Sequence, residues 1–474
     1  MSLSISHTNA TPDHSSLTVQ SQERLLIFAR FPEPGKSKTR LIPALGSHRA
    51  AEIYKALAKS TLEVARAFTT ERRCFIEIHF TGGDGKLMAE EFGDAFVYVE
   101  QRGDCLGSRL AAATERSFSS GARRVLVIGT DCISLDSQCL HDALDRLKSC
   151  DVVLGPASDG GYYLMGLSKQ YARLFHGVDW GSERVLSQTK AVANDLQLRT
   201  EYLSVLDDID HPEDLVACRS SFRAINKLLP LAVPGRLSVI VPVINEEIHL
   251  EATLHSIGQP SEDLEIIVAD GGSTDRTIEI ASAYGCRILP CNQGRARQMN
   301  AASVVATGEV LLFLHGDTRL PVNYRNDLSR CLDSGRVAGA FRLKIAGSNL
   351  GLRIVEWGAN LRSRWLLLPY GDQGIFMRSD DFFKLGGYRH LPIMEDFELC
   401  RRIRRYGKME LLDSTIETSG RRWHARGIVK TTLMNQICIL GFLVGIPPER
   451  IATIYGVAKK SHVPHAVGGA DKII

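Results

Sequence analysis

This sequence lacks several features that would assign it to a common class of protein. Its eleven cysteines are scattered and contain no C-x-x-C pair, which argues against a zinc site or a disulfide framework and fits a reducing compartment. The net charge is only +3, without the strong basic excess that nucleic-acid binders carry. The longest apolar stretch near the C-terminus, Ile437 to Ile446, has about ten residues, half of what a membrane span needs. We therefore expect a cytoplasmic protein that does not bind nucleic acid. Peripheral contact with the inner face of a membrane stays open, and the sequence does not indicate an oligomeric state.

The composition is that of a globular protein with enough chain for two cores. Of the 474 residues, 44% are hydrophobic and 23% are charged. Residues 1–21 are rich in Ser, Thr, His and Gln and lack an apolar segment, so we expect a disordered tail there rather than a signal peptide. We predict a first domain over 22–216, a linker over 217–236, a second domain over 237–460 and a flexible tail over 461–474.

Both halves alternate short apolar strands with amphipathic helices. That rhythm predicts an α/β fold in each half, with two tandem, mostly parallel sheets. The expected strands of the first half are Leu25–Ala29, Cys74–Phe80, Val125–Ile128 and Val152–Leu154, with a helix over Ala50–Phe68. In the second half we expect strands at Leu237–Val241, Leu264–Ala269 and Val310–Leu314, with helices at Glu246–Ile257 and Arg276–Tyr284.

Two of the apolar runs stop on an aspartate, Asp131 in the first half and Asp317 in the second. Each run reads as a buried parallel strand that delivers a carboxylate to the carboxyl edge of a sheet, where ligands of open α/β sheets bind. A carboxylate that faces a diphosphate there is a natural ligand of Mg²⁺ or Mn²⁺. We therefore predict two nucleotide-handling domains in tandem.

The second half carries an ordered set of motifs at its expected strand ends. They are Pro242 to Glu246 with Asn245, Asp270-Gly271-Gly272, Gly294-Arg295, His315-Gly316-Asp317, Glu395-Asp396 at a helix start, and Arg421-Arg422-Trp423. Each motif alone is weak, but their order and spacing are specific. Together they resemble the family 2 glycosyltransferases of the GT-A fold over residues 236–455.

That resemblance implies a role for each motif. The segment from Pro242 to Glu246 would seat the nucleobase, and Asp270 would accept hydrogen bonds from base or ribose while Gly271 allows a close backbone approach. Gly294 and Arg295 suit the phosphates or the sugar, and Arg421, Arg422 and Trp423 suit the acceptor or a phosphate.

The resemblance also implies the chemistry. Asp317 would hold the metal on the donor diphosphate. Asp396, with Glu395 beside it, would be the general base that deprotonates the acceptor hydroxyl for an inverting attack.

One motif departs from the family pattern. The usual Asp-x-Asp metal motif is His315-Gly316-Asp317 here, so a single carboxylate remains, and His315 either supports the metal or faces the sugar. The variant resembles a subgroup associated with arsenosugar biosynthesis, in which a His-x-Asp-Thr strand end and a late Arg-Arg-Trp recur. Taken singly, each motif also has a structural interpretation: Asp270 as a turn with a helix cap, Glu395 and Asp396 as a favourable helix start, and Trp423 as a core anchor.

In the first half, a basic loop follows the opening strand. It contains Lys36, Lys38 and Arg40, which we expect to face phosphates across the sheet edge. The Gly35-Lys36-Ser37 segment is not a Walker A loop, because Arg30 stands where that loop needs its first glycine.

Three acidic elements complete the first half: Asp131, Asp159 in Asp-Gly-Gly-Tyr-Tyr, and Asp210 in Asp-Ile-Asp-x-Pro-Glu-Asp-Leu. With the basic loop they resemble, over residues 23–216, an uncharacterised GT-A-like family related to nucleotidyltransferases and also found beside arsenosugar genes. The resemblance implies that Asp131 and Asp210 share a metal, with Asp159 near the nucleotide. The Gly-Gly-x-Gly loop of true nucleotidyltransferases is absent, which leaves nucleotidyl transfer, sugar transfer and a degenerate domain as alternatives.

Three hypotheses follow for the whole chain. The first is a metal-assisted glycosyltransferase that uses a nucleotide-sugar donor and a small-molecule or lipid acceptor, with arsenosugar biosynthesis as one context. The second is a bifunctional enzyme whose first half makes an activated sugar that the second half uses. In the third, the first half is a non-catalytic scaffold for the second.

Overall fold

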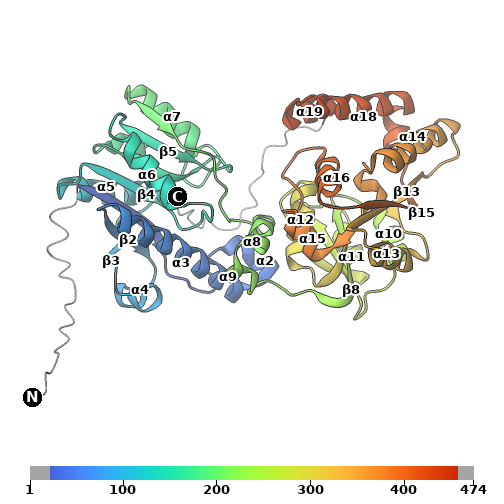
Figure 1. The fold of residues 1–474 in the computed structure, drawn as a ribbon, viewed down its shortest axis with the longest axis horizontal. Helices are drawn as coiled ribbons and strands as arrows, with labels where there is room; N and C mark the ends of the chain where they lie inside the picture. Colours follow the sequence, from blue (N-terminus) through green and yellow to red (C-terminus); the bar gives the residue numbers. More distant parts are fainter. Residues whose placement is uncertain (1–21, 457–474) are drawn as a thin grey trace, which may run out of the picture. The chain divides into compact units, whose positions relative to one another are not determined.

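The computed structural model describes residues 22–456, which divide into two compact units (Figure 1). The first unit comprises residues 22–39 and Ser47–Asp210, and the second comprises Arg40–Gly46 and the chain from His211 onward. The tails predicted at 1–21 and 461–474 lie outside the described residues. Each unit is an α/β structure with a mixed, mostly parallel sheet, as the strand–helix rhythm predicts.

The first unit is built on seven strands in the order β3-β2-β1-β4-β6-β5-β7. Their bounds are β1 Glu23–Arg30, β2 Phe75–Thr81, β3 Val97–Glu100, β4 Arg124–Ile128, β5 Val152–Pro156, β6 Tyr162–Leu167 and β7 Thr200–Tyr202. The helices of this unit are α3 Ser47–Glu71, α4 Gly85–Phe92, α5 Leu106–Ser119, α6 Ser137–Arg146 and α7 Val185–Asp195, with the short η2 Ala172–Phe175.

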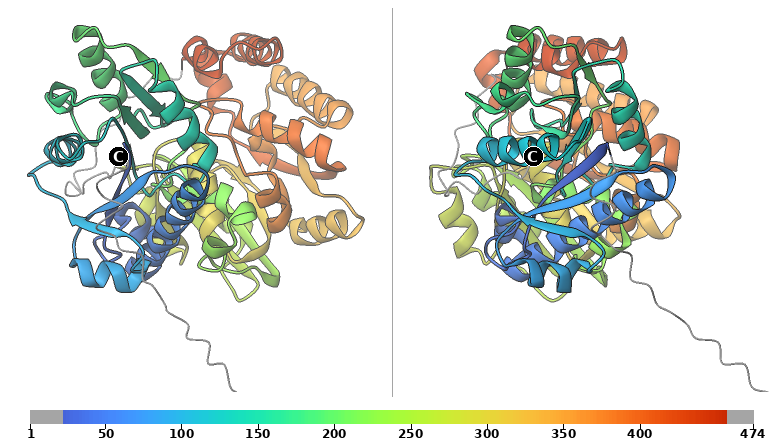
Figure 2. Two further views of the ribbon diagram at one scale, coloured as in Figure 1. Left: turned by 60° about the vertical axis from the view of Figure 1, so that its left-hand side comes forward. Right: turned by 90° about the vertical axis from the view of Figure 1, so that its left-hand side faces the viewer.

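The central position of β1 explains why its sequence is almost uniformly apolar. Leu25 and Ile27 belong to a core cluster that includes residues of α3 and α6. Leu26 and Phe28 point to the other face, into a cluster with residues of α5 and α7. Helices therefore cover both faces of the sheet (Figure 2), and a strand buried on both sides cannot alternate polar with apolar residues.

The second unit has eight strands in the order β10-β9-β8-β11-β14-β13-β15-β12. Their bounds are β8 Val233–Val243, β9 Leu264–Asp270, β10 Arg287–Pro290, β11 Gly308–Phe313, β12 Thr318–Arg319, β13 Ala338–Ile345, β14 Ile375–Arg378 and β15 Met409–Thr418. Its helices are α2 Ile42–Leu45, α8 Leu215–Ser221, α9 Arg223–Asn226, α10 Leu250–Ile257, α11 Thr277–Ala283, α12 Arg295–Val305, α13 Tyr324–Asp333, α14 Leu350–Leu366, α15 Ser379–Lys384, α16 Glu395–Tyr406, α17 Arg421–Arg426, α18 Ile428–Leu443 and α19 Pro448–Tyr455. The short helices η3 Pro212–Asp214 and η4 Gly371–Gln373 complete the list, and η1 Thr39–Leu41 spans the boundary between the units.

The two sheets share one topology. Replacing β1 to β7 by β8, β9, β10, β11, β13, β14 and β15 converts the first strand order into the second, with β12 as an addition at the edge. In both units, one inserted strand, β6 or β14, runs antiparallel to its neighbours. The sequence halves look unlike each other, so this repeat is a property of the folds and not of a residue pattern.

The segment predicted as a linker, 217–236, is part of the second unit in the structure. Helix α8 packs against α12 and α15, and the Arg219 guanidinium lies 4.4 Å from the Phe383 ring and donates to the carbonyl of Pro230 over 2.6 Å. Strand β8 already begins at Val233. Arg219, a basic residue of this segment, therefore contributes to the packing of the second unit.

Candidate functional site

In the second unit, the loops that follow β8 and β9 are tied together by side chains. The Asn245 backbone N–H donates to Ser273 Oγ over 3.0 Å, and the Asn245 carboxamide oxygen accepts from the Thr274 N–H over 2.8 Å. Asn245 has φ of +54°, a left-handed conformation that asparagine tolerates better than most residues. The Glu246 N–H donates to Thr277 Oγ1 over 2.7 Å, so Glu246 stays in the loop and the helix predicted to start there begins at Leu250.

Asp270 is the last residue of β9, where the sequence places it, and is nearly buried. Its carboxylate accepts from the N–H groups of Gly272 and Ser273 at 3.1 and 3.0 Å. These bonds orient the side chain, as in a helix-capping turn, and the remaining lone pairs stay available to a ligand. Pro242, the second-last residue of β8, pairs with Ala269 in the adjacent strand.

Gln298 is a site residue that the motif search missed. It lies in the second turn of α12, is 3% exposed, and donates to the carbonyls of Val243 and Ala269 at 2.9 and 2.7 Å. It thereby joins the ends of β8 and β9 to the helix that Gly294 and Arg295 open. A Cβ on Gly271 would come within 3.2 Å of the Gln298 amide, so glycine is needed there for a close approach rather than for a left-handed φ.

Arg421 links Asp317, the predicted metal ligand, to Glu246 in the loop after β8. Its Nη2 lies 3.2 Å from Asp317 Oδ2 and is also paired with Glu246 Oε1. Both carboxylates are nearly covered, with 10% and 12% of their side-chain surfaces exposed. Arg421 thus lies beside the donor-side carboxylates in the structure, and one nitrogen serves both of them.

His315, Gly371 and Asp396 meet at a point where no side chain fits between them. A Cβ on Gly371 would lie 2.7 Å from His315 Nε2 and 3.3 Å from Asp396 Oδ2. The Gly371 N–H donates to Asp396 Oδ2 over 2.5 Å, and the Phe397 N–H donates to Oδ1 over 2.7 Å. Burial, and then the positive field of Arg295, hold the pKa of His315 well below its usual range. His315 is therefore a neutral imidazole at pH 7.

Two more carboxyl groups in this cluster have raised pKa values. Burial, and then repulsion from Asp396, raise the pKa of Glu395 to about 7, against the opposing field of Arg295 and Arg422. Burial raises the pKa of Asp372 to about 6, and Asp396 adds to that rise while Arg422 opposes it. Perturbed carboxyl groups beside fixed cations are typical of functional sites.

Asp372 is another residue that the sequence analysis missed. Its Oδ1 is buried and has no hydrogen-bond partner among residues 22–456. The signal was available in Gly371-Asp372-Gln373-Gly374, a short acidic turn bounded by glycines.

The backbone just before Glu395 is strained. Met394 has φ of +70°, which is unusual for a residue with a long side chain. It directly precedes α16, so the strained residue fixes the direction in which Glu395 and Asp396 leave the loop. Trp423, by contrast, is buried in a small cluster with Leu343 and Leu352 and is placed as a packing residue.

In the first unit, Lys38 lies between the two aspartates that were predicted to share a metal. Its ammonium is 3.0 Å from Asp131 Oδ2 and 2.9 Å from Asp210 Oδ1, and only 5% of its side chain is exposed. The carboxylates more than offset the effect of burial and raise the pKa of Lys38. Lys38 also has φ of +47°, a strained conformation that its ion pairs help to hold.

The other residues of the basic loop are not part of this cluster. Lys36 is 67% exposed and pairs with Glu33 over 2.9 Å. Arg40 falls in the segment that belongs to the second unit. Of the predicted phosphate-facing residues, the structure therefore brings only Lys38 to the acidic strand ends.

A pocket opens next to this lysine bridge. It is lined by Asp131, Asp159 and Asp210 together with apolar and small residues, namely Leu106, Gly161, Tyr162, Trp180, Gly181, Ser182 and Val185, and by Asp208. Asp208 was not among the predicted residues. Burial, and then repulsion from Asp131, raise its pKa well above the usual range. Within the described part of the chain, no group forms a hydrogen bond with its buried Oδ1.

The two units share one electrostatic arrangement. In each unit two carboxylates converge on one nitrogen, Lys38 Nζ in the first unit and Arg421 Nη2 in the second. A position that accepts a cationic nitrogen between two carboxylates also fits a divalent cation in charge and in donor type. Among residues 22–456, however, no three His, Cys, Asp or Glu side chains are grouped closely enough to ligate a metal alone, so further ligands would have to come from the donor diphosphate.

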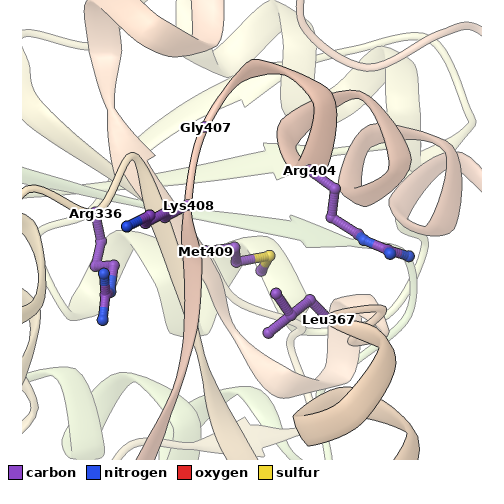
Figure 3. Close-up of a pocket in the computed structure, with 6 residues that line it drawn as sticks. All are labelled: Arg336, Leu367, Arg404, Gly407, Lys408 and Met409. Atoms are coloured by element: carbon purple, nitrogen blue, oxygen red, sulfur yellow. The ribbon is translucent and has the colours of Figure 1, made fainter.

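A separate pocket of about 430 Å³ lies at the opposite edge of the second sheet (Figure 3). It is lined by Arg336, Leu367, Arg404, Gly407, Lys408 and Met409. These residues lie near the end of α16 and the start of β15, whereas the predicted site residues lie at the start of α16 and after the end of β15. None of the predicted site residues lines this pocket.

Comparison with known protein families identifies a domain in each unit. Residues 64–182 match the family described as "Uncharacterized protein conserved in bacteria (DUF2064)", and residues 238–367 match "Glycosyl transferase family 2". The predicted fusion of one domain of each kind is therefore confirmed.

Individual relatives agree with the second match. The chain is 40% identical over 91 residues to a PGL/p-HBAD biosynthesis glycosyltransferase of Mycobacterium bovis, which covers 18% of this chain. It is 34% identical over 89 residues, or 17% of this chain, to an uncharacterized glycosyltransferase of Haemophilus influenzae. Both alignments span 36% of the relative, about a third of its length.

Solved structures were also compared. Glucosyl-3-phosphoglycerate synthase of Mycobacterium tuberculosis, in complex with Mn²⁺ and UDP, is 18% identical with a TM-score of 0.33 and covers 43% of this chain and 79% of its own. A structure of S. aureus TarS is 17% identical with a TM-score of 0.32 and covers 46% of this chain and 69% of its own.

Proposed function

We propose that the second unit is a glycosyltransferase that moves a sugar from a nucleotide-sugar donor to an acceptor hydroxyl with inversion at the anomeric carbon. The observation that carries this proposal is that Asp270 ends β9 at the carboxyl edge of the sheet, while Asp317 and Asp396 both lie close enough to the buried Asp372 to raise its pKa, in the unit that matches the glycosyltransferase model. Parallel strands deliver ligand-binding residues to such an edge.

The donor side would be formed by the tied loops after β8 and β9. Asp270 is held by two backbone N–H groups, which preorganises its remaining acceptor sites for ribose or base hydroxyl and amino groups. Arg295 and Arg422 act on the same buried cluster as Glu395, so two guanidinium groups are available for diphosphate oxygens. The resemblance and the matched family support a nucleoside diphosphate as the leaving group.

Asp396 is proposed as the general base. Its two backbone hydrogen bonds fix the carboxylate in one orientation, and a positioned base contributes about 10²–10⁴-fold to such a reaction. It would take the acceptor proton as the acceptor oxygen bonds to the sugar C1 and the C1–O bond to the diphosphate breaks. Glu395, whose pKa is raised to about 7, lies next to it in sequence and would share the proton near neutral pH.

Asp317 is proposed as the metal ligand, with Glu246 and His315 as neighbours. Mn²⁺ or Mg²⁺ bound there would neutralise negative charge on the leaving diphosphate. Arg421 occupies the same carboxylates in the structure, so we expect metal binding to release it toward the phosphates.

The acceptor is either a small molecule, of which arsenosugar precursors are one class, or a lipid hydroxyl. A cytoplasmic location fits both. Among the described residues, no helix has the length and apolar character that crossing a bilayer requires.

Slow donor hydrolysis tests this proposal without knowledge of the acceptor. The purified full-length protein is incubated with UDP-, GDP- and dTDP-sugars and Mn²⁺ or Mg²⁺, alongside Asp317→Asn and Asp131→Asn. Hydrolysis of one donor that is lost in Asp317→Asn and kept in Asp131→Asn supports the second unit as the transferase. Loss in Asp131→Asn alone contradicts the assignment.

A second function is proposed for the first unit, namely transfer of a nucleotidyl group. Its pocket joins an acidic cluster with a buried lysine to an apolar wall that includes Trp180, an arrangement suited to phosphates and a flat base. Attack of a sugar phosphate on the α-phosphorus of a nucleoside triphosphate would release pyrophosphate. Pyrophosphate release that is abolished by Asp131→Asn supports this activity, and its absence with all common triphosphates favours the scaffold alternative.

A further inference from the structure

Helix α14 carries a row of exposed apolar residues along one face. They are Leu350, Ile354, Trp357, Leu361 and Trp365, at spacings of four, three, four and four residues. Such spacing puts side chains on a single face of a helix. The opposite face, with Leu352 and Ala359, packs into a core cluster with Trp423 and Ile428. The exposed row is therefore not part of that cluster.

Helix α18, which packs against α14, carries a second row of the same kind. Its members, Val429, Leu433, Ile437, Leu440 and Val444 just beyond the helix, again recur every three or four residues and are all exposed. The two helices pack against each other and their two rows together expose ten large apolar side chains, which is unusual for the surface of a monomeric protein. We call the two rows together the α14–α18 face.

The two aromatic members of this face are unusual for a water-exposed surface. The side chains of Trp357 and Trp365 are 67% and 78% exposed. Tryptophan has an apolar ring and a polar N–H, and it favours the boundary between lipid headgroups and acyl chains. A core residue or a surface residue that served only solubility would not combine this size with this exposure.

The charges around the face are predominantly positive. Within 350–366 and 424–456, the sequence has Glu356 and Glu449 as acidic residues, against six basic ones: Arg353, Arg362, Arg364, Arg426, Lys430 and Arg450. Glu356 is turned inward, because it accepts from the Ile345 N–H and pairs with Arg353 over 3.0 Å.

Basic side chains also lie at the C-terminal end of α14. Leu367, the residue after that helix, lines the pocket of Figure 3 together with Arg404 and Lys408. Arg404 projects from the last turn of α16, and Met409 lies next to Leu367. Positive charge therefore borders the apolar row at the end that carries Trp365.

We propose that the α14–α18 face binds an anionic lipid surface and holds the second unit on a membrane. Apolar side chains and two tryptophans would enter the interface while arginine and lysine remain at the headgroups, which is how amphipathic helices dock in the plane of a bilayer. This mode needs no spanning helix, in agreement with the lengths and composition of the described helices.

The inference goes beyond the proposed sugar transfer and does not depend on it, because lipid binding is measured without donor or acceptor. A second copy of the chain is the competing occupant of the face. The charge argues against it, since two identical basic faces repel each other while an anionic lipid surface attracts them.

Vesicle co-sedimentation tests the proposal on the full-length protein. Phosphatidylcholine vesicles are compared with vesicles of phosphatidylcholine mixed equally with phosphatidylglycerol. We expect binding to the anionic vesicles that weakens with added salt. The double variant Trp357→Ser with Trp365→Ser should bind roughly tenfold less tightly or worse, which corresponds to about 1.4 kcal/mol.

Val322→Ser is the matched control, because Val322 is an apolar residue 97% exposed in the same unit but outside both rows. It should bind as the wild type does. No binding of the wild type to anionic vesicles, or equal loss in the Val322 variant, overturns the proposal. Sedimentation velocity separates the alternative: a dimer that the tryptophan variant dissociates, without vesicle binding, would assign the face to a second copy.

Discussion

Replacing Lys38 by methionine tests the electrostatic design of the first unit. The change keeps most of the apolar length of the side chain but removes the ammonium between Asp131 and Asp210. With side-chain exposures of 5%, 10% and 21% for the three residues, the carboxylates lose a buried partner and gain little water. Removing one partner of a buried ion pair costs about 3–5 kcal/mol.

For a unit of this size, each kcal/mol corresponds to a change in Tm of about 2–4 °C. We therefore expect the unfolding transition of the first unit to fall by roughly 6–20 °C at neutral pH.

The pH dependence gives the sign of the effect. In the wild type, the raised pKa of Lys38 means that its stabilisation is present below the ordinary lysine pKa and is lost as the pH rises through the folded value. In the variant, the carboxylates of Asp131 and Asp210 would lose the stabilising ammonium and their pKa values would rise, so folding would take up protons. The stability difference between wild type and variant should therefore be largest near neutral pH and shrink in acid, where the carboxylates are protonated.

Calorimetry of the full-length protein measures both transitions in one scan. Lys36→Met is the control, because Lys36 is exposed and pairs with the neighbouring Glu33, and exposed pairs contribute at most about 1 kcal/mol. If Lys38→Met and Lys36→Met melt alike at neutral pH, the buried bridge does not stabilise the unit and the reasoning is wrong. Mg²⁺ should raise the Tm of Lys38→Met more than that of the wild type, since the ammonium no longer competes with it for Asp131 and Asp210. Equal shifts would contradict the divalent site.

Three further predictions concern the second unit. Gly371→Ala places a Cβ 2.7 Å from His315 Nε2 and 3.3 Å from Asp396 Oδ2. This variant should lose about 1–3 kcal/mol of stability in urea unfolding and most of the donor hydrolysis. Gly358→Ala is the control: its Cβ would point into open space, so both its stability and its activity should be unchanged. Asp396→Asn should reduce transfer by about 10²–10⁴-fold with little change in donor KM, and full activity would exclude Asp396 as the base. Because the pKa of Glu395 is raised to about 7, the folded protein binds a proton there that the unfolded chain releases near pH 4.5, so stability falls as the pH rises between these values. Glu395→Gln should remove that fall, and unchanged urea midpoints from pH 5 to about 8 would contradict the titration.

The local features of both units were readable in the sequence. Strands such as Leu25–Ala29 and Val310–Leu314 are continuous apolar runs because the sheets are covered on both faces. Asp270 and Asp317 come at the ends of such apolar runs, so the sequence alone predicts that they lie at or just after the end of a strand. The start of α16 at Glu395 was equally visible, because acidic residues there favour the helix N-terminus.

Contacts between distant residues were not readable in this way. The antiparallel strands β6 and β14 have no pattern that separates them from parallel ones, since orientation is set by pairing partners. The basic loop offered Lys36, Lys38 and Arg40 as equals, and only packing decided that Lys38 alone enters the acidic cluster. The sequence shows which residues are charged, but the tertiary structure determines which residues they pair with.

The difference between local sequence features and contacts between distant residues also applies to the repeated architecture and to the site. The sequence by itself determined two α/β units with carboxylates at strand ends, because burial and strand length are local properties. Tertiary structure alone decided that both units share one strand order, that Asp372 lies near Asp396 and Arg422, and that Arg421 reaches Asp317 across more than a hundred residues. Interactions of that range depend on the three-dimensional path of the chain, which no short sequence pattern encodes.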